Sequence, residues 1–571
     1  MSLSMRSTDP RLVLALGLIA HGASGCLEHP LKPVEYDMAS QFETTLDVVE
    51  NKDVDILFVI DNSGSMGEEQ ATLAKNFDHF IAVLEHPDVD ANYRIGITTT
   101  DNGAPGCNGT TPEGGKLRLT SCRDRQQEFT WNGENPPVEK FDEACGNICP
   151  PELAGLETTP TVTDHDTEPK PRAWIERIEG ATNLPEGVTT TDAFRCFGPQ
   201  GIDGCGFEMP LETMWKALAL MEQPGQPNFD FRRRGAILGV VLVTDEADCS
   251  LNPDHAAIFD KNGTKVFWSD PGAPGPTSAV CWNAGVTCTG GPGTYENCDP
   301  ADKDESGQIT SDPDEAVLLP VSRYVDMLQN IEDEKKTMAP DQEVIVAGIV
   351  GVPSGYSGPE DIVYQDAVDP TFQAKYGIGP GCSSPAAEAV PPVRLREFAR
   401  AFEVDGEPNL YSICDDDYGP ALEGFADKLI SQIRPACMPA CVADTDPETP
   451  DRLDPDCIVE QVYPEGGGTE VIPPCVLTCG GSPCAPDERD QADGWEFPSE
   501  EASACFRYLT DRWGAEGTPT KLDDMGDACI EEGWNLEFRI ERRIGSPPPS
   551  GTRIQATCQL SQQEEIDCPD L

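Results

Sequence analysis

The sequence contains few histidines and no signature of a common class of enzyme. Its 571 residues include only 6 His, and none of them lies in an HExxH motif. A GxSxG nucleophile motif and a Walker-type glycine-rich loop are also missing. We therefore expect a binding protein rather than an enzyme. A hydrolase that polarises a carbonyl through a bound cation is kept as a further alternative.

Basic residues are scarce as well. Lys and Arg number 40 against 101 Asp and Glu, which gives a formal net charge of −61. Such a field repels phosphate backbones, so we expect no nucleic-acid partner. It attracts cations and basic partners instead. Gly (53) and Pro (52) are abundant, which predicts long loops.

Long hydrophobic runs are also missing. The run near the N-terminus, Leu12 to Ala20, follows Arg6 and Arg11 and is too short to cross about 30 Å of hydrocarbon. It is typical of a signal peptide, expected over residues 1–25. Ala-Ser-Gly-Cys before and at Cys26 resembles a bacterial lipobox, which implies a lipid-anchored protein of the cell envelope. Leu27 in place of an Asp favours the outer membrane. A plain signal peptide is the alternative.

Cysteine is plentiful, and its count is informative. If Cys26 carries the lipid, 22 of the 23 Cys remain, an even number typical of a disulfide framework in an exported chain. Twelve lie in 51–434 and ten in 435–571, which favours a boundary near Pro435 without a bridge across it. Short Cys-x3-Cys spacings, as at Cys145 and Cys149, leave zinc as the alternative, but paired CxxC knuckles are missing.

Apolar strands alternate with amphipathic helices, which predicts an α/β fold. We expect a doubly wound, mostly parallel, Rossmann-like sheet with helices on both faces. The expected strands are 54–60, 93–99, 237–244, 344–349 and 409–413, with 116–120 as a hairpin partner of the second. The expected helices are 68–85, 211–220, 316–331, 393–402 and 418–433.

Several segments interrupt this alternation. We read 26–50 as a tether and 51–434 as one domain with long insertions at about 102–180, 249–315 and 351–390. Residues 435–571 are predicted to form a small disulfide-rich α+β module. In that module we expect a helix over 499–512 and strands over 536–540 and 552–559.

A polar loop follows the first predicted strand. In Asp61-Asn62-Ser63-Gly64-Ser65-Met66-Gly67, a carboxylate alternates with two hydroxyls at the carboxyl end of a buried strand, where open α/β sheets bind ligands. These hard oxygen donors suit Mg²⁺, and Mn²⁺ or Ca²⁺ after it. Gly64 and Gly67 would allow a tight turn. The alternative is purely structural, with an Asx turn at Asp61 and a serine capping the next helix.

The whole string DILFVIDNSGSMG resembles the von Willebrand factor type A (VWA) domain and its metal-ion-dependent adhesion site. The segments LGVVLVTDEAD, EVIVAGIVG and NLYSICDDDYGPALEGFADKLI agree with later strands and the last helix of that family. The resemblance implies that Ser63 and Ser65 ligate the cation directly, and that Asp61 and Asp245 act mostly through water. A carboxylate of a protein partner would complete the shell, as in adhesion.

The sequence departs from that family at one ligand. The family supplies a Thr before a middle helix, but the stretch Gly204-Cys205-Gly206-Phe207-Glu208 has no Thr. Glu208 could donate the oxygen instead, and so could Thr182 or the threonines at 189–191. Asp101 ends the second strand and could face the same edge. If the third ligand is lost, the domain would be a surface scaffold with a vestigial site.

A second acidic loop resembles part of a calcium site. Asp302, Asp304, Ser306 and Gly307 fit the first positions of an EF-hand loop, but position twelve is Pro313 instead of Glu. Calcium at 302–314 is therefore a secondary expectation, against a solvated acidic loop. The partner of the protein, its oligomeric state and the role of 435–571 stay open.

Overall fold

The computed structural model describes most of the chain after residue 42. The described residues are 43–48, 51–86, 89–107, 109–133, 135–337, 342–385, 387–404, 406–433, 435–446, 452–463, 467–512, 520–546, 548 and 552–568. The predicted signal peptide, Cys26 and most of the predicted tether lie outside these residues. Within them, no helix is both long enough and apolar enough to cross a membrane.

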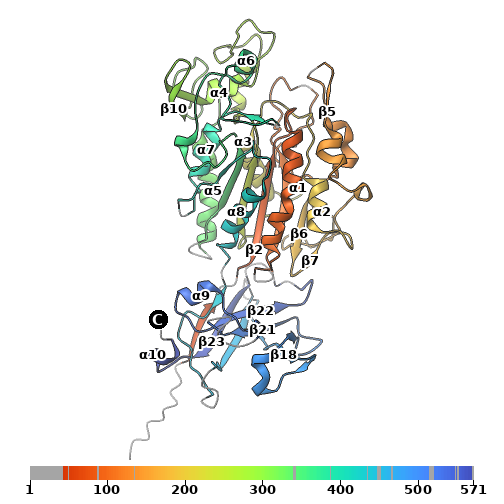
Figure 1. Ribbon diagram of the computed structural model, residues 1–571, viewed down its shortest axis with the longest axis vertical. Helices are drawn as coiled ribbons and strands as arrows, with labels where there is room; N and C mark the ends of the chain where they lie inside the picture. Colours follow the sequence, from red (N-terminus) through yellow and green to blue (C-terminus); the bar gives the residue numbers. More distant parts are fainter. Residues whose placement is uncertain are drawn as a thin grey trace, which may run out of the picture. The chain divides into compact units, whose positions relative to one another are not determined.

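A seven-stranded mixed sheet forms the centre of the larger part of the chain (Figure 1). Its strand order is β14-β11-β8-β2-β3-β6-β7. The first five strands in this order run parallel to one another, β6 runs antiparallel to β3, and β7 runs antiparallel to β6. The bounds are β14 Leu410–Ser412, β11 Ile345–Val350, β8 Ile237–Val243, β2 Asp53–Ile60, β3 Asn92–Thr99, β6 Trp174–Ile178 and β7 Ala181–Thr182.

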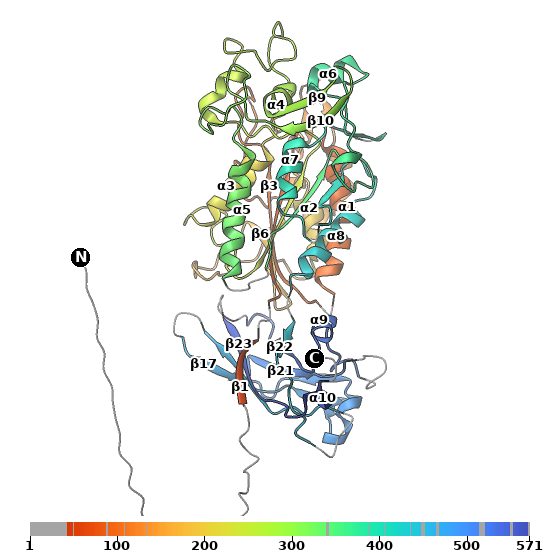
Figure 2. The same cartoon turned by 90° about the vertical axis from the view of Figure 1, so that its left-hand side faces the viewer.

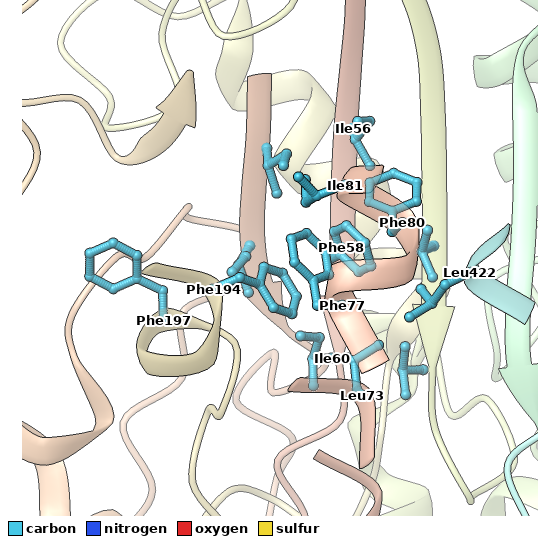
Figure 3. Close-up of a cluster of buried hydrophobic side chains, with 14 of the residues drawn as sticks. Ile56, Phe58, Ile60, Leu73, Phe77, Phe80, Ile81, Phe194, Phe197 and Leu422 are labelled. Carbon is cyan, nitrogen blue, oxygen red and sulfur yellow. The ribbon is translucent and has the colours of Figure 1, made fainter. Parts of the chain in front are cut away.

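One face of the sheet packs against α1 (Gly67–Leu84), α2 (Thr190–Phe197) and α8 (Gly419–Ile430). Alternate residues of β2 point to this face, as the two-residue repeat of a strand requires. Phe58 lies among Phe77, Phe80 and Phe194, and the rings of Phe77 and Phe194 stack with centroids 3.5 Å apart (Figure 3). This aromatic cluster holds α1 against β2, and so fixes both ends of the loop that connects them.

The opposite face packs against α3 (Pro210–Met221), α5 (Val321–Lys336) and α7 (Val393–Arg400). Leu57 and Val59 of β2 point to this side and are fully buried. Because both faces are covered, β2, β8 and β11 are nearly continuous apolar runs, as expected for central parallel strands. The larger part of the chain is therefore a mixed α/β structure with two hydrophobic layers.

The insertions gather small elements at one end of the sheet (Figures 1 and 2). They include α4, α6 and the hairpin of β9 and β10, around a small core that contains Phe259, Trp268 and Val280. The bounds are β4 Thr130–Trp131, β5 Val138–Glu139, α4 Ala279–Gly285, β9 Val286–Gly290, β10 Tyr295–Pro300, α6 Pro370–Tyr376, β12 Cys382–Ser383 and β13 Glu388–Ala389. Short 3-10 helices span Cys122–Phe129, Pro151–Leu153, Pro253–Phe259 and Pro359–Asp361, and a π-helix spans Asp142–Gly146.

The cysteines after residue 100 are paired, which confirms the disulfide framework. The pairs before residue 435 are Cys107–Cys205, Cys122–Cys145, Cys149–Cys196, Cys249–Cys281, Cys288–Cys298 and Cys382–Cys414. Those after it are Cys437–Cys529, Cys441–Cys568, Cys457–Cys558, Cys475–Cys505 and Cys479–Cys484. The zinc interpretation is wrong for these cysteines, because a disulfide sulfur has no thiolate to offer.

The residues after 435 have their own hydrophobic core, which includes Val459, Phe506, Phe538 and Ile554. One sheet has the order β1-β23-β16-β17, and two further sheets have the orders β15-β22-β21 and β19-β18-β20. The bounds are β1 Glu43–Val48, β15 Ala436–Cys437, β16 Cys457–Val462, β17 Thr469–Ile472, β18 Val476–Cys479, β19 Ser482–Pro483, β20 Gly494–Glu496, β21 Ala504–Leu509, β22 Glu537–Arg542, β23 Arg553–Gln559, α9 Asp527–Glu531 and α10 Glu564–Asp567. A 3-10 helix spans Pro486–Gln491.

Three expectations from the sequence differ from the structure. Residues 43–48, expected in the tether, form β1, which pairs antiparallel with β23. The helix expected over 499–512 is replaced by β21, because its aromatic residues suit a strand paired with β22. Residues 116–120 form no strand: the Arg118 N–H donates to the Ile97 carbonyl of β3 at 2.8 Å, but the Leu117 N–H goes to the side chain of Asn228. The antiparallel partner of β3 is β6, which lies inside the predicted first insertion.

Candidate metal site at the carboxyl edge of the sheet

The carboxyl ends of three neighbouring strands meet at one place. Ile60 of β2 pairs with Thr99 of β3 and with Val243 of β8. The residues that follow these strands are Asp61, Thr100 and Thr244, and all three are buried. Parallel pairing thus brings together polar residues that are far apart in sequence.

The loop after β2 is organised by Asp61. One carboxylate oxygen accepts the Ser63 N–H at 2.7 Å, and the other accepts the hydroxyl of Thr244 at 2.5 Å. The Ser63 and Ser65 hydroxyl oxygens lie 3.3 Å apart. Neither serine caps α1, whose N-terminus has no side-chain cap. The Asx turn at Asp61 is therefore present, and the serine hydroxyls bond to site carboxylates instead of the helix, Ser63 to Asp61 and Ser65 to Asp245.

Gln70, in the first turns of α1, anchors this loop through hydrogen bonds of its side-chain amide. Its amide nitrogen donates to the carbonyl oxygens of Asp61 and Gly201, both at 2.8 Å. Its amide oxygen accepts the Gln200 N–H at 2.9 Å. The loop after β2 is thus tied to the 200–204 segment, where Gly204 also donates its N–H to the Asn62 carbonyl at 2.9 Å.

The loop glycines do not serve the tight turn that their sequence positions predict. Neither Gly64 nor Gly67 has a positive φ, so the backbone conformation does not require glycine at either position. A Cβ on Gly64 would lie 2.6 Å from the indole of Trp131, and one on Gly67 would lie 2.8 Å from Lys140. Both glycines therefore make room for side chains of the first insertion.

Glu208 lies at the same edge, directly before α3, and is fully buried. One carboxylate oxygen accepts a hydrogen bond from the Thr100 hydroxyl. Its backbone carbonyl accepts the Cys249 N–H at 2.7 Å, and the disulfide Cys107–Cys205 pins the segment before it. The structure thus brings Glu208 to the predicted site.

Asp245 follows Thr244 and is buried, with its backbone carbonyl accepting the Val390 N–H at 2.9 Å. Its carboxylate accepts a hydrogen bond from Ser65. Glu69 of α1 and Glu246 are buried carboxylates in the same electrostatic neighbourhood. Neither residue was expected at the site from the sequence, although Glu69 falls on the inward face of an amphipathic helix.

Four buried oxygens around this loop lack hydrogen-bond partners among the described residues. They are Asn62 Oδ1, Glu69 Oε2, Glu208 Oε1 and Asp245 Oδ1. A buried polar atom without a partner costs about 1–3 kcal/mol, so such atoms are rare in folded proteins. All four are acceptors of the hard-oxygen type that Mg²⁺, Mn²⁺ and Ca²⁺ prefer. The residues present therefore fit a divalent cation.

Electrostatics agrees with that fit. Burial, reinforced by the neighbouring Asp245 carboxylate, raises the pKa of Asp61 to about 7, that of Glu69 to about 9 and that of Glu246 to about 8. Burial also raises the pKa of Asp245, and it raises that of Glu208 well above its usual value with Asp61 adding to the effect. Buried acids that repel one another in this way are stabilised in their charged form by a cation.

Some of the predicted oxygen donors lie elsewhere. Thr182 is in the edge strand β7, Thr189 caps α2, and the Thr190 hydroxyl lies 2.6 Å from the Tyr93 hydroxyl. Asp101 is buried near Glu208, but its carboxylate accepts the N–H groups of Gly103 and Cys205. The threonines that reach the site are Thr100 and Thr244. Their position after paired strands is the signal that could have identified them.

The acidic loop at 302–314 has a different character. One carboxylate oxygen of the half-buried Asp304 accepts the N–H groups of Ser306 and Gln308 and the Ser306 hydroxyl at 2.6–3.0 Å. Among the described residues, the one group of three His, Cys, Asp or Glu whose ligand atoms lie within 4.8 Å of one another is Asp511, Asp523 and Asp524. A cation at the sheet edge would therefore need the serine hydroxyls as well as carboxylates.

Comparisons with known proteins give matches among solved structures and none among family models. No protein-family model matches the chain, and no curated protein matches it. Among solved structures, two crystal structures of the pilus adhesin SpaC from Lactobacillus rhamnosus GG match with a TM-score of 0.26 and 8% and 9% identity. The pilus adhesin RrgA from Streptococcus pneumoniae matches with a TM-score of 0.20 and 10% identity.

The SpaC matches cover 90% of this chain and 40% of the adhesin, and the RrgA match covers 91% and 59%. The chain therefore spans less than two thirds of the length of these adhesins. At these TM-scores, the fold and the site rest on the chain's own geometry.

Proposed function

We propose that this chain is an exported cell-envelope protein that binds a partner protein through a divalent cation held at the carboxyl edge of a VWA-type domain. In this proposal the sheet is the doubly wound, Rossmann-like sheet of that family, and the chain is a binding protein rather than an enzyme. Mg²⁺ is the favoured cation, with Mn²⁺ and Ca²⁺ as substitutes.

One observation carries the proposal: near the loop that presents Ser63 and Ser65, buried acceptor oxygens have no hydrogen-bond partner within the described part of the chain. Hydrogen-bond networks normally satisfy such atoms, and a cation bound beside the two serines would satisfy those within its reach. In the proposed site Ser63 and Ser65 ligate the cation directly, Asp61 and Asp245 hold it directly or through water, and Glu208 replaces the threonine of the VWA family.

The proposed partner offers a carboxylate that completes the coordination shell. The cation makes this possible because it offsets the negative charge of the buried acids, which would otherwise repel an acidic group. Residues of the first insertion border the site, since Trp131 and Lys140 lie against the loop glycines. They would decide which partner fits.

Export is supported by the disulfides, which form and persist in oxidising compartments. We further propose that Cys26 carries a lipid and that the protein is anchored in the outer membrane. Cys26 lies outside the described residues, so mass spectrometry of the N-terminal fragment is the direct check on this anchor.

One observation favours a second candidate, a surface scaffold with a vestigial metal site. Where the structure describes the chain, the carboxylates at the sheet edge do not form a group of three with ligand atoms within 4.8 Å of one another. Their raised pKa values also allow them to be neutral, and so to be buried without a cation. A scaffold predicts that chelators change neither stability nor partner capture.

Isothermal titration of Mg²⁺, Mn²⁺ and Ca²⁺ into the full-length protein separates these candidates. The proposal expects binding that Ser63→Ala abolishes and that Asp304→Asn, a matched change in the acidic loop, leaves intact. Binding that is lost in Asp304→Asn but kept in Ser63→Ala would move the cation to 302–314. A wild-type protein that takes up no cation in the presence or absence of acetate would favour the scaffold.

A further inference from the structure

Trp131 lies beside the proposed metal loop in an unusual setting. It ends β4, a two-residue strand paired with β5, and it is half-buried. Its indole touches Gly64, between the two serines of the loop, and also Gly133, where a Cβ would lie 2.2 Å from the ring. Because Gly64 and Gly133 have no positive φ, space for this ring is the reason that the structure offers for both glycines.

The segment that carries Trp131 is held firmly. Phe129, two residues earlier, is buried and packs edge-on against Phe141, with ring centroids 5.9 Å apart. The Lys140 N–H donates to the Phe129 carbonyl at 2.9 Å, and the Lys140 ammonium pairs with Glu68 at the start of α1. The nearby disulfide Cys122–Cys145 closes the segment. Trp131 is therefore presented in a fixed place relative to Ser63 and Ser65.

The Trp131 side chain has an unused donor. Among the described residues, its indole N–H has no hydrogen-bond partner. Tryptophan residues with one wet polar end are enriched in protein interfaces and supply many of their strongest contacts. A partner segment that reached the cation would pass this ring, because the ring touches the residue between the two ligating serines.

We propose that Trp131 is the specificity-determining contact of the metal site and selects a peptide segment in which the carboxylate has an apolar or aromatic neighbour. That neighbour packs on the indole ring, and a backbone carbonyl of the same segment accepts the indole N–H. This inference rests on the proposed function, since it assumes that the carboxylate binds the cation.

Selection from a library of displayed random heptapeptides tests the inference on the full-length protein. Peptides are bound in Mg²⁺ and eluted with EDTA. The wild type is expected to enrich Asp or Glu beside an aromatic or apolar residue. Trp131→Ala is expected to keep the acidic residue and to lose the preference for its neighbour. Trp495→Ala, which removes a half-buried tryptophan after residue 435, is the matched control and should select like the wild type.

The affinity of one enriched peptide for each variant then measures the size of the Trp131 contact. Its affinity should fall about two- to tenfold in Trp131→Ala, the effect of a single aromatic contact. Trp131→Phe keeps a ring but loses the N–H, and should lie between Trp131→Ala and the wild type. An unchanged neighbour preference or an unchanged affinity in Trp131→Ala, with the peptides still eluted by EDTA, overturns the inference.

The proposed function fails in a different way. If peptides bind but resist EDTA, or if Ser63→Ala selects the same EDTA-eluted pool as the wild type, the cation is not at the proposed site. Loss of the neighbour preference in Trp131→Ala with EDTA elution retained supports both proposals.

Discussion

Two acidic regions of this chain could hold a cation, and they differ in what their oxygens already bind. At the carboxyl edge of the sheet, buried oxygens of Glu69, Glu208 and Asp245 have no hydrogen-bond partner among the described residues. In the acidic loop at 302–314, Asp304 is half-buried, and one of its carboxylate oxygens accepts N–H groups of its own loop. Acidic composition alone therefore does not distinguish a metal site, whereas unsatisfied buried acceptors do.

The sharpest way to break this comparison is to remove one ligand from each region. Ser63→Ala should reduce Mg²⁺ affinity by about 100-fold or more, because even partners behind the ligands are worth about 10–100-fold in metal affinity. Ser306→Ala in the acidic loop should leave the affinity unchanged. Calorimetric titration measures both, and equal losses in the two variants would contradict the distinction drawn here.

A smaller loss of Mg²⁺ affinity is expected from changing a residue that orients a ligand without binding the cation itself. Thr244 donates its hydroxyl to Asp61 at 2.5 Å and fixes the orientation of that carboxylate. Thr244→Val keeps the size of the side chain but removes the donor, so Mg²⁺ affinity should fall about tenfold or somewhat more. Thr310→Val, which removes a hydroxyl that donates to Glu315 at 3.1 Å, is the control in the acidic loop. If neither substitution changes the Mg²⁺ affinity, Asp61 does not contribute to the site.

The pH dependence of stability sharpens the comparison further. Burial raises the pKa of Asp61 to about 7 and that of Glu246 to about 8, whereas in the unfolded chain both titrate near 4. Between these values the folded protein holds more protons than the unfolded chain, so the free energy of unfolding falls as the pH rises. With EDTA present, the Tm should therefore be several degrees lower at pH 8 than at pH 5.

Mg²⁺ should restore the Tm more at pH 8 than at pH 5, because it stabilises the charged carboxylates. Na⁺ at equal ionic strength controls for the general screening of a chain with net charge −61. A Tm gain from Mg²⁺ that is the same at both pH values would argue that these acids do not face the cation.

The sequence predicted the central elements well, and the reason is physical. The apolar runs at 54–60 and 237–244 are strands β2 and β8, which are buried on both faces, so their pattern shows no alternation to misread. The Asp-x-Ser-x-Ser loop and Asp245 come directly after the ends of those strands in the chain, so their place in the fold could be predicted with them. Glu208 reached the same edge because the segment before it is pinned there by a disulfide.

Other features depended on contacts distant in sequence. β6 pairs with β3 across the first insertion, and β1 pairs with β23 near the other end of the chain. A local sequence pattern does not predict pairing between strands that lie so far apart in the chain. The roles of Thr100 and Thr244 likewise depend on strand register, and those of Gly64 and Gly67 depend on the neighbours Trp131 and Lys140.

A crystal grown in Mn²⁺ and measured for anomalous scattering tests the central claim most directly. The account predicts a peak within bonding distance of the Ser63 and Ser65 hydroxyl oxygens, with the Glu208 or Asp245 carboxylate in the same coordination shell. It also predicts that Ser63→Ala crystals lose this peak. A peak confined to residues 302–314, or to Asp511, Asp523 and Asp524, with none at the sheet edge would contradict it.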